Sequence, residues 1–315
     1  MPSPCIARTK RRNTLYLETF TLPIEQEVRL IQDRMTENGG TLGYIDNIYP
    51  CDIFPRKGLR ELSFARVTIL YGGNGSGKST LLNLIAAKLG LNRVSPFNSG
   101  ELFDAYAQSC AYKTGTDEEG FAERIPNGSR IITSDDVFDY MLAARDNNAE
   151  IGEAIEQGKA EYAKLKFGDN VVLKSMDDYE ALRLQVQSRR KTLSRRKFLR
   201  REVGTEVKLN SNGETALAYF RDKLKNDRLY CLDEPENSMS PKTQQELVRL
   251  LEEMAHYCGC QFILATHSPF LLSMSGARIY DLDTTPVTIR NWWELESMRV
   301  YHAFFEKHRH LFTED

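Results

Sequence analysis

The sequence predicts an α/β fold with a mostly parallel central sheet, and three observations indicate it. The apolar, β-branched run 67–71 leads into a glycine-rich stretch, and a helical pattern closed by Gly90 follows. The apolar run 229–232 ends in two acids, Asp233 and Glu234. Predicted strands and helices alternate along most of the chain. This alternation is typical of a parallel sheet covered by helices, with a ligand at the carboxyl edge of its strands.

The first half of the chain carries the elements that lead into the glycine-rich stretch. Four apolar or alternating runs predict strands, at residues 14–22, 44–54, 59–70 and 129–134. Pro23 opens a predicted helix over 24–37. Residues 102–111 fit either a helix or a short strand, and the periodicity does not decide between them.

The middle of the chain, residues 145–204, changes in composition. It is rich in Glu, Lys, Arg and Gln and holds no proline, which predicts a helical insertion with a break around 167–170. Eight cations stand among the thirteen residues 189–201, with no acid between them. This basic segment fits a solvated helix face, and it equally fits a contact for a phosphate backbone or an acidic partner.

The last third returns to an α/β pattern. Strands are predicted at 228–233, 261–266, 278–282 and 287–290. Ser240 and Pro241 predict the start of a helix over 242–257. A closing helix is expected over 291–312, with aromatic residues that we expect to pack in the core: Trp292, Trp293, Tyr301, Phe304 and Phe305.

Composition sets the limits of the protein class. The chain has 315 residues, of which 41% are hydrophobic and 27% charged, as expected of a soluble protein with a sizeable core. The net charge of −2 gives no global attraction to nucleic acid or to membranes, so such a partner would need a local patch. No signal peptide and no membrane-spanning run is visible, and the six scattered cysteines show no zinc-ligand spacing. We therefore expect a cytoplasmic protein without a membrane segment.

The glycine-rich stretch has the residues of a phosphate-binding loop. Its sequence GGNGSGKST fits the pattern G-x-x-x-x-G-K-[ST] between a strand and a helix. Backbone N–H groups of such a loop surround a phosphate, and the helix start adds its positive dipole end. We expect Lys78 to reach the β- and γ-phosphates and the Ser79 hydroxyl to bind Mg²⁺. The predicted nucleotide-binding residues are Gly72, Gly73, Asn74, Gly75, Ser76, Gly77, Lys78, Ser79 and Thr80.

The acids after the run 229–232 complete the predicted chemistry. A parallel strand delivers its last residues to the same sheet edge as the phosphate loop. Asp233 can therefore hold Mg²⁺ opposite Ser79, directly or through water. Glu234, the next residue, is placed to orient or deprotonate an attacking water.

These motifs resemble those of ABC-type ATPases, especially the SMC/RecF-like and OLD-like branch. The phosphate loop corresponds to Walker A, and residues 233–237 resemble Walker B. Three further stretches are similar to the family's signature, D-loop and switch-histidine loop, at residues 211–214, 237–241 and 266–269. The five motifs follow the family's order over most of the chain.

The resemblance implies an ABC-ATPase head with an antiparallel β subdomain and a helical insertion. The chain would be one ABC-type ATPase domain, 1–315, with an insertion at 145–204 and a C-terminal helix at 291–315. It implies ATP and Mg²⁺ as cofactors, and a head-to-tail homodimer in which each ATP also meets Ser211 and Gly213 of the other copy. Catalytic roles would fall to Lys78, Glu234 and His267, the last on the γ-phosphate or the water.

The sequence also departs from the family pattern. The expected Q-loop glutamine is not clear, and Gln108, Asp135 and Asp136 are the candidates. The insertion is too short for an SMC coiled coil. Too few residues follow 290 for the nuclease domain of OLD-like proteins, so we interpret the acidic pair Asp281 and Asp283 as a strand-end turn.

Small ATPases of this kind in bacteria pair with nucleases or toxins in anti-phage systems. The resemblance therefore implies an ATP-driven conformational switch that controls an effector, with the basic segment 189–201 as a contact surface, which would also admit nucleic acid. Two alternatives stay open: the ATPase subunit of a membrane transporter, and a DNA-binding or DNA-repair ATPase of SMC type.

Overall fold

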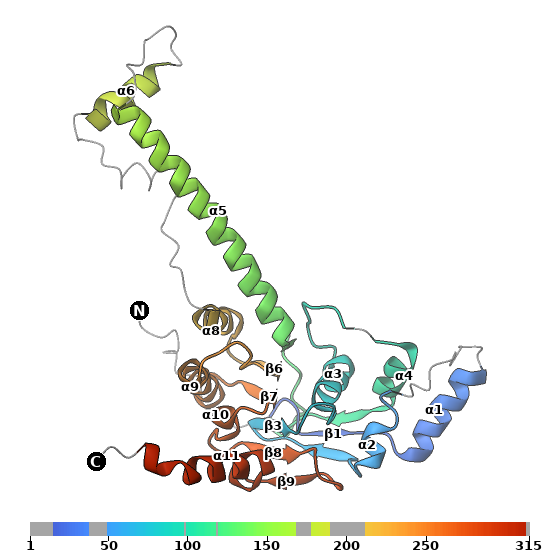
Figure 1. Ribbon diagram of the computed structural model, residues 1–315. Helices are drawn as coiled ribbons and strands as arrows, with labels where there is room; N and C mark the ends of the chain where they lie inside the picture. The colour runs from blue at the N-terminus through green and yellow to red at the C-terminus, as the bar shows by residue number, and fades with distance from the viewer. Residues whose placement is uncertain are drawn as a thin grey trace. The chain divides into compact units, whose positions relative to one another are not determined.

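The computed structural model describes residues 15–37, 49–97, 99–117, 119–167, 178–189 and 212–312 (Figure 1). The chain divides into two compact units. The first combines residues 1–138 with 216–315, and the second is formed by residues 139–215. The first unit contains the nucleotide-site motifs that the structure describes, except the signature residues 212–214, which lie in the second unit.

The centre of the first unit is a six-stranded sheet. Its strand order is β5-β6-β7-β3-β8-β9, and all neighbours are parallel except the pair β8 and β9. The strands are β5 (Arg130–Ile132), β6 (Leu229–Asp233), β7 (Gln261–Ala265), β3 (Val67–Tyr71), β8 (Arg278–Asp281) and β9 (Thr288–Arg290). Every residue of β3 and β7 is buried, which explains why these strands are continuous apolar runs.

Helix α3 (Lys78–Leu89) connects this sheet to a second one. It packs against β5, β6 and β7 on one side, and its apolar residues belong to a core that also includes Phe20 and Leu62. Those two residues come from a small antiparallel sheet of β2 (Glu61–Ser63), β1 (Thr19–Thr21) and β4 (Ala111–Lys113). Because it is enclosed by both sheets, α3 is apolar around most of its circumference. The predicted fold class is confirmed.

The other helices of the first unit cover the sheets. They are α1 (Glu25–Glu37), α2 (Ile53–Arg56), α4 (Glu101–Ser109), α9 (Pro241–Tyr257) and α10 (Pro269–Leu272), and α8 (Asn212–Lys223) enters from the second unit. Helices α9 and α10 lie on the side of the parallel sheet opposite α3 (Figure 1). The Ser240 side chain caps α9 by accepting a hydrogen bond from the Thr243 N–H.

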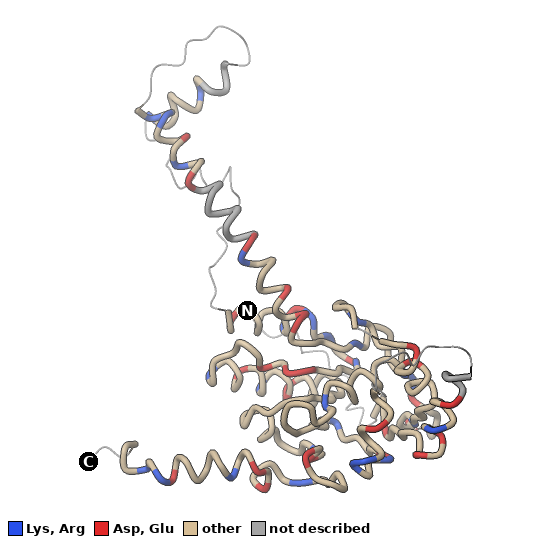
Figure 2. The backbone as a smooth tube through the Cα atoms, turned by 45° about the vertical axis from the view of Figure 1, so that its right-hand side comes forward, with Lys and Arg blue, Asp and Glu red and all other residues tan. Residues whose placement is uncertain are grey.

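The second unit is helical where it is described. Helix α5 (Ser134–Phe167) starts in the first unit and continues into the second, and α6 (Asp178–Arg189) follows. Acidic and basic residues are mixed along α5 (Figure 2). Arg189 is the one member of the basic segment among the described residues. The domain boundaries, with the insertion at 145–204 and the C-terminal helix at 291–315, stay predictions.

Several expected strands are wrong in extent. The run 59–70 divides into β2 and β3, which belong to different sheets, and Thr68 Oγ1 accepts a hydrogen bond from the Ala65 N–H at the bend between them. Within 44–54, residues 44–48 lie outside the described part of the chain, and residues 53–54 start helix α2. In the run 14–22, only residues 19–21 form a strand. The undecided stretch 102–111 lies in α4, with β4 starting at its last residue.

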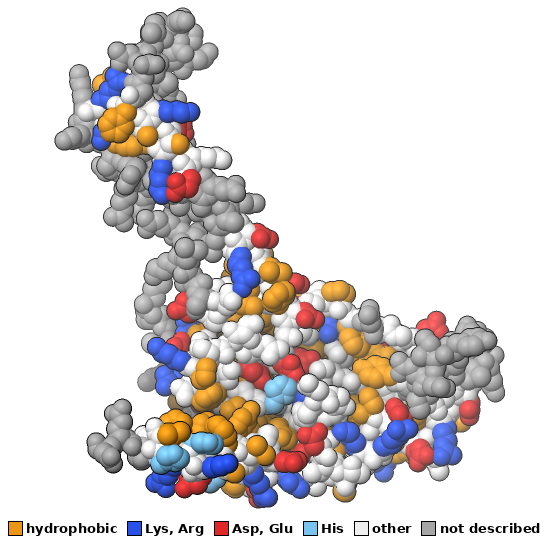
Figure 3. Space-filling view, in the orientation of Figure 1, with side chains coloured by type: hydrophobic (Ala, Val, Ile, Leu, Met, Phe, Trp, Pro, Cys, Tyr) orange, Lys and Arg blue, Asp and Glu red, His pale blue; other side chains and the backbone are white. Residues whose placement is uncertain are grey.

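The closing helix is shorter than expected, and the expectation that its aromatic residues are buried is wrong. The segment consists of a 3₁₀ turn (Trp292–Glu294), helix α11 (Glu296–Lys307) and a second 3₁₀ turn (Arg309–Leu311). Leu295 and Met298 are buried, but Phe304 and Phe305 are 55% and 54% exposed. Hydrophobic and histidine side chains gather along this segment at the surface (Figure 3). The sequence shows an amphipathic pattern but not whether anything in the same chain covers the apolar face.

Among the described residues, no helix combines the length and the apolar character that crossing a membrane requires.

Candidate active site

The phosphate loop joins β3 to α3 at the carboxyl edge of the parallel sheet. Its last glycine, Gly77, has φ of 98°, in the left-handed region that favours glycine. A Cβ atom there would lie 3.1 Å from Ile53 Cγ2 and 3.3 Å from Phe54 Cε1. Helix α2 therefore packs directly behind the loop, and glycine is required at this position.

Two buried polar groups of the loop lack an anionic partner. The Lys78 ammonium is buried and donates hydrogen bonds to the carbonyl oxygens of Gly72 and Gly73, at 2.6 and 3.0 Å. No ion pair is formed by Lys78 among the described residues. Ser76 Oγ is buried and has no hydrogen-bond partner in the described part of the chain. A buried cation and a free hydroxyl beside loop N–H groups fit a phosphate group.

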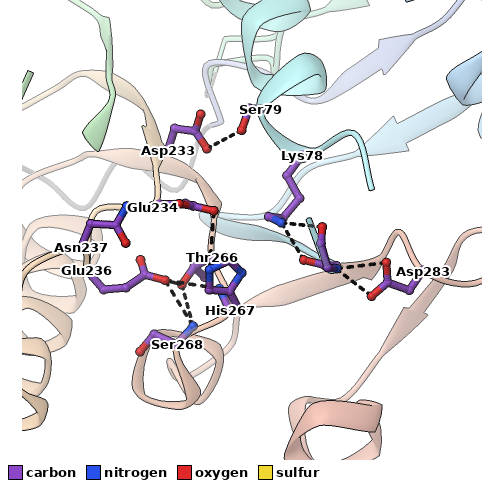
Figure 4. Close-up of polar contacts among 12 residues, drawn as sticks. Lys78, Ser79, Asp233, Glu234, Glu236, Asn237, Thr266, His267, Ser268 and Asp283 are labelled. Atoms are coloured by element: carbon purple, nitrogen blue, oxygen red, sulfur yellow. Dashed lines mark hydrogen bonds and ion pairs between the residues drawn. The ribbon is translucent and has the colours of Figure 1, made fainter. Parts of the chain in front are cut away.

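Ser79 and Asp233 meet at the start of α3. Ser79 Oγ donates a hydrogen bond of 3.1 Å to Asp233 Oδ1 (Figure 4). Burial raises the pKa of Asp233 to about 6, the charge of Glu234 adds to the shift, and Ser79 and Lys78 oppose it. A partly buried carboxylate beside a hydroxyl fits a Mg²⁺ ion, because the charge of the ion would favour the ionised form of the acid. Phosphate and water oxygens would supply its other ligands.

Glu234 and His267 are brought together although they lie 33 positions apart in the sequence (267 − 234). His267 Nε2 lies 3.5 Å from Glu234 Oε1, and Asn237 Nδ2 donates to Glu234 Oε2 at 3.1 Å (Figure 4). Glu234 has φ of 47°, an uncommon conformation for a residue with a side chain. The Glu234 N–H donates to the Ala265 carbonyl on the neighbouring strand. A carboxylate held between an amide and an imidazole is suited to orient a water molecule.

Glu236 was not singled out from the sequence, although it belongs to the same loop. It is 6% exposed, and its Oε1 accepts hydrogen bonds from Thr266 Oγ1 at 2.5 Å and from the backbone N–H groups of His267 and Ser268 at 3.3 Å. Burial raises the pKa of Glu236, and the hydrogen bond from Thr266 opposes the shift. The only signal in the sequence is a second glutamate directly after Pro235.

The acidic pair after β8 does more than form a turn. The Asp281 carboxylate is buried and accepts the Asp283 N–H at 3.1 Å. The Asp283 carboxylate in turn accepts the Gly73 N–H, with distances of 3.0 and 2.8 Å to its two oxygens (Figure 4). The turn therefore anchors the first half of the phosphate loop, a contact that spans 210 positions and has no local signal.

The Q-loop candidates have other contacts. Gln108 is exposed on α4, and its backbone carbonyl accepts a hydrogen bond from Lys88 Nζ. Asp136 is buried in the first turn of α5 and accepts hydrogen bonds from Ser95 N, Ser95 Oγ and Thr133 N. Its carboxylate therefore joins the segment around Ser95 to the start of α5. Asp135 is exposed on the same turn. None of the hydrogen bonds or ion pairs among the described residues joins these three to Glu234 or His267.

Arg93 is a residue near the site that the sequence did not indicate. Burial lowers the pKa of its guanidinium, and the carboxylates of Asp136, Asp233 and Asp135 oppose the shift. Arg93 is therefore close enough to the predicted metal ligand Asp233 to interact with its charge. The sequence shows only a single arginine shortly after a helix, and this gives no indication that Arg93 lies near Asp233.

The predicted signature is described in part. Ser211 lies outside the described residues. Gly213 is the second residue of α8 and is buried, and Asn212 Oδ1 accepts a hydrogen bond of 2.8 Å from Arg145 Nη2 on α5. The expectation that Ser211 and Gly213 meet the nucleotide of a second copy stays a prediction.

A loop of this geometry between a parallel strand and a helix, with an acidic strand end opposite, defines a P-loop nucleotide-binding protein. Family comparison narrows this class. A family model described as ABC transporter matches residues 61–237, more than half of the chain. The chain therefore belongs to the ABC-type ATPase family. A second model, described as "AAA domain, putative AbiEii toxin, Type IV TA system", matches residues 215–273.

Solved structures show likenesses at low identity. The SMC head domain from Thermotoga maritima is 14% identical, with 88% of this chain and 99% of that chain covered and a TM-score of 0.35. The Smc head domain from Pyrococcus furiosus bound to the C-terminal domain of ScpA is 12% identical, with 78% and 94% covered and a TM-score of 0.37. A dimeric ATP-binding cassette bound to ADP and Pi is 14% identical, with 74% and 88% covered and a TM-score of 0.33. No curated protein matches the sequence.

Proposed function

We propose that this protein binds ATP with Mg²⁺, hydrolyses it to ADP and phosphate, and uses the cycle as a dimeric conformational switch. Membership of the ABC-type ATPase family supports ATP binding. The observation that carries the proposal is the position of Glu234, held between Asn237 and His267 at the sheet edge that also carries Lys78.

Each group has a role that follows from its chemistry. The Lys78 ammonium exchanges the carbonyl oxygens it now contacts for β- and γ-phosphate oxygens, which are stronger acceptors. Ser79 and Asp233 hold Mg²⁺, which neutralises charge on the phosphates. Glu234 orients the attacking water and takes its proton, while His267 bonds the γ-phosphate or the water.

A second copy completes the site in this proposal. Ser211 and the N–H groups at the start of α8 form an anion site that needs a phosphate from outside its own pocket. In a head-to-tail dimer, each ATP lies between the phosphate loop of one copy and Ser211 and Gly213 of the other. ATP then closes the dimer and hydrolysis opens it.

The switch controls a partner effector, a nuclease or a toxin, in bacterial anti-phage defence. The match of residues 215–273 to an AbiEii-like model supports a setting of this kind. The basic segment 189–201 is the proposed contact for the effector or for nucleic acid. The site of action is the cytoplasm.

The experiment uses Glu234→Gln, which keeps the shape of the side chain and removes the base. This variant binds ATP, hydrolyses it about 100-fold or more slowly, and elutes as a dimer when ATP and Mg²⁺ are present. Wild-type protein with ADP is the control and elutes as a monomer. A variant that stays monomeric with saturating ATP refutes the dimeric switch, and undiminished hydrolysis refutes the role of Glu234.

Two other functions fit the same family membership. The matched model is described as ABC transporter, which favours the ATPase subunit of a membrane transporter. The basic segment favours a DNA-binding or DNA-repair ATPase of SMC type. Copurification with a nuclease or toxin supports effector control, and detergent-dependent association with a membrane protein supports transport. DNA stimulation of hydrolysis that disappears in Arg195→Ala/Arg196→Ala supports DNA binding.

A further inference from the structure

The loops that contain Glu234 and His267 begin at the paired ends of the neighbouring strands β6 and β7. Asp233 on β6 pairs with Ala265 on β7, and both chains turn within the next residues. His267 lies in a short loop, and its side chain is 42% exposed. Few contacts can therefore hold the imidazole itself, and its position depends on how the backbone of residues 266–268 is fixed.

Glu236 is the group that fixes this backbone. One carboxylate oxygen, Oε1, accepts hydrogen bonds from the Thr266 side chain and from the N–H groups of His267 and Ser268. Ser268 N–H is also bonded to Thr266 Oγ1 at 3.0 Å. An ionised carboxylate suits this task because it only accepts, and charge-assisted hydrogen bonds are stronger than neutral ones.

A second connection links the same backbone to the loop 237–240. Ser268 Oγ donates to Gln244 Oε1 at 2.7 Å, and Gln244 Nε2 donates to the Met239 carbonyl at 3.1 Å. The Met239 N–H donates to the Glu236 carbonyl at 3.0 Å, so the path closes on Glu236. Residues 237, 238 and 240 are exposed, whereas Glu236 and Ser268 are buried. The surface loop and the His267 loop are thus parts of one hydrogen-bonded unit.

We propose that Glu236 is a positioning residue that sets the placement of His267 against Glu234 and makes it respond to the loop 237–240. The inference rests on the proposed ATPase function. Among the described residues, no hydrogen bond or ion pair joins Glu236 to the side chain of Glu234 or His267. It acts through the backbone N–H of His267, so its loss displaces the imidazole while the hydrogen bond between Ser79 and Asp233 is kept.

The kinetic experiment compares Glu236→Ala, Glu236→Gln and Thr266→Val with wild type in steady-state ATP hydrolysis. Glu236→Ala lowers kcat by about 10- to 100-fold, since small displacements of a catalytic group have effects of this size. KM changes less than kcat because the contacts of Lys78 and Ser79 do not involve Glu236. Glu236→Gln restores most of the rate because its amide oxygen still accepts, and Thr266→Val lowers kcat without removing the carboxylate.

The double variant separates positioning from a general loss of structure. If Glu236 acts through His267, then Glu236→Ala has no further effect on kcat in a His267→Ala background. Gln261→Ala is the matched control, because Gln261 is a buried side chain bonded to Leu17 and Ala65, away from His267. Its effect combines independently with His267→Ala. Independent combination for Glu236→Ala, or a raised KM with unchanged kcat, overturns the proposal.

A spectroscopic measurement keeps the inference testable if the protein does not hydrolyse ATP. The chain has five histidines, so the ring proton resonances are few, and His267→Ala identifies the one of interest. In Glu236→Ala this resonance shifts, while those of His256 and His302, which lie on α9 and α11, stay in place. An unchanged His267 resonance overturns the proposal, whereas a shift without any ATPase activity in wild type leaves the positioning role standing and refutes the proposed function.

Discussion

Replacing Asp233 by asparagine should stabilise the nucleotide-free protein at neutral and alkaline pH. The carboxylate lies at the end of β6, where burial and the charge of Glu234 raise its pKa from 3.8 to about 6. The folded protein therefore holds the Asp233 proton more tightly than the unfolded chain does. The stability that this proton provides is present at low pH, is lost as the pH rises through about 4 to 6, and stays lost above that range.

The magnitude follows from the size of the shift. A difference of about two pH units, at about 1.36 kcal/mol per unit, corresponds to about 3 kcal/mol of unfolding free energy at pH values above both pKa values. At about pH 5 the loss is about half as large, because Asp233 is then still mostly protonated in the folded state. Asparagine never ionises, and its Oδ1 can still accept the Ser79 hydroxyl, so it avoids the loss without breaking this hydrogen bond.

Urea unfolding of wild type and Asp233→Asn at about pH 5 and about pH 8 measures the effect. The advantage of the variant should be larger at the higher pH by about 1.5 kcal/mol. Asp33→Asn is measured alongside as the control, because Asp33 is exposed on α1. A variant that is less stable than wild type at pH 8 refutes the interpretation that burial destabilises the charged form of Asp233. A stability difference that does not depend on pH refutes it as well.

Three further predictions concern nucleotide binding and the dimer. Lys78→Ala should weaken ATP binding about 100-fold or more, because it removes the one buried ammonium of the loop; calorimetry with undiminished affinity would contradict the site. Asp283→Ala should lower ATP affinity by about threefold to tenfold, the effect expected of one lost hydrogen bond, because the Gly73 N–H loses its acceptor. Asp283→Asn keeps an oxygen acceptor and should keep most of the affinity. Arg145→Ala should release Asn212 and raise the protein concentration needed for ATP-dependent dimerisation, while ATP affinity of the monomer is unchanged; unaltered dimerisation in light scattering would count against a role of this contact.

Local pattern was sufficient for the elements that carry the chemistry. The strand before Gly72 and the strand that ends at Asp233 are short apolar runs. Both faces of such strands are buried, so their residues are apolar in succession and the runs are easy to find in the sequence. The loop between β3 and α3 depends on residues that are adjacent in sequence. The rule that parallel strands end at one sheet edge then predicts that Ser79 and Asp233 approach each other, and the structure places them 3.1 Å apart.

Local pattern failed where a segment is short or where its environment decides its form. The run 59–70 carries apolar residues at strand spacing along its whole length and looks like one strand, yet it belongs to two sheets because its halves pair with different strands. The aromatic face of α11 has the periodicity of a core helix. Its exposure depends on the absence of a covering element among the described residues, which periodicity does not report.

The sequence by itself determined the phosphate loop and the two acids at the end of β6, because each is specified by residues that are adjacent in the chain. It also determined the fold class and the family, because the order of strands, helices and motifs along the chain can be read without knowing their contacts. Only the tertiary structure decided that Glu236 holds the backbone of His267 and that Asp283 anchors Gly73. The physical reason is that these contacts join segments 31 and 210 positions apart. Such a contact depends on the distance and direction of a donor in another loop, and no periodicity within the segment of the side chain encodes the position of that donor.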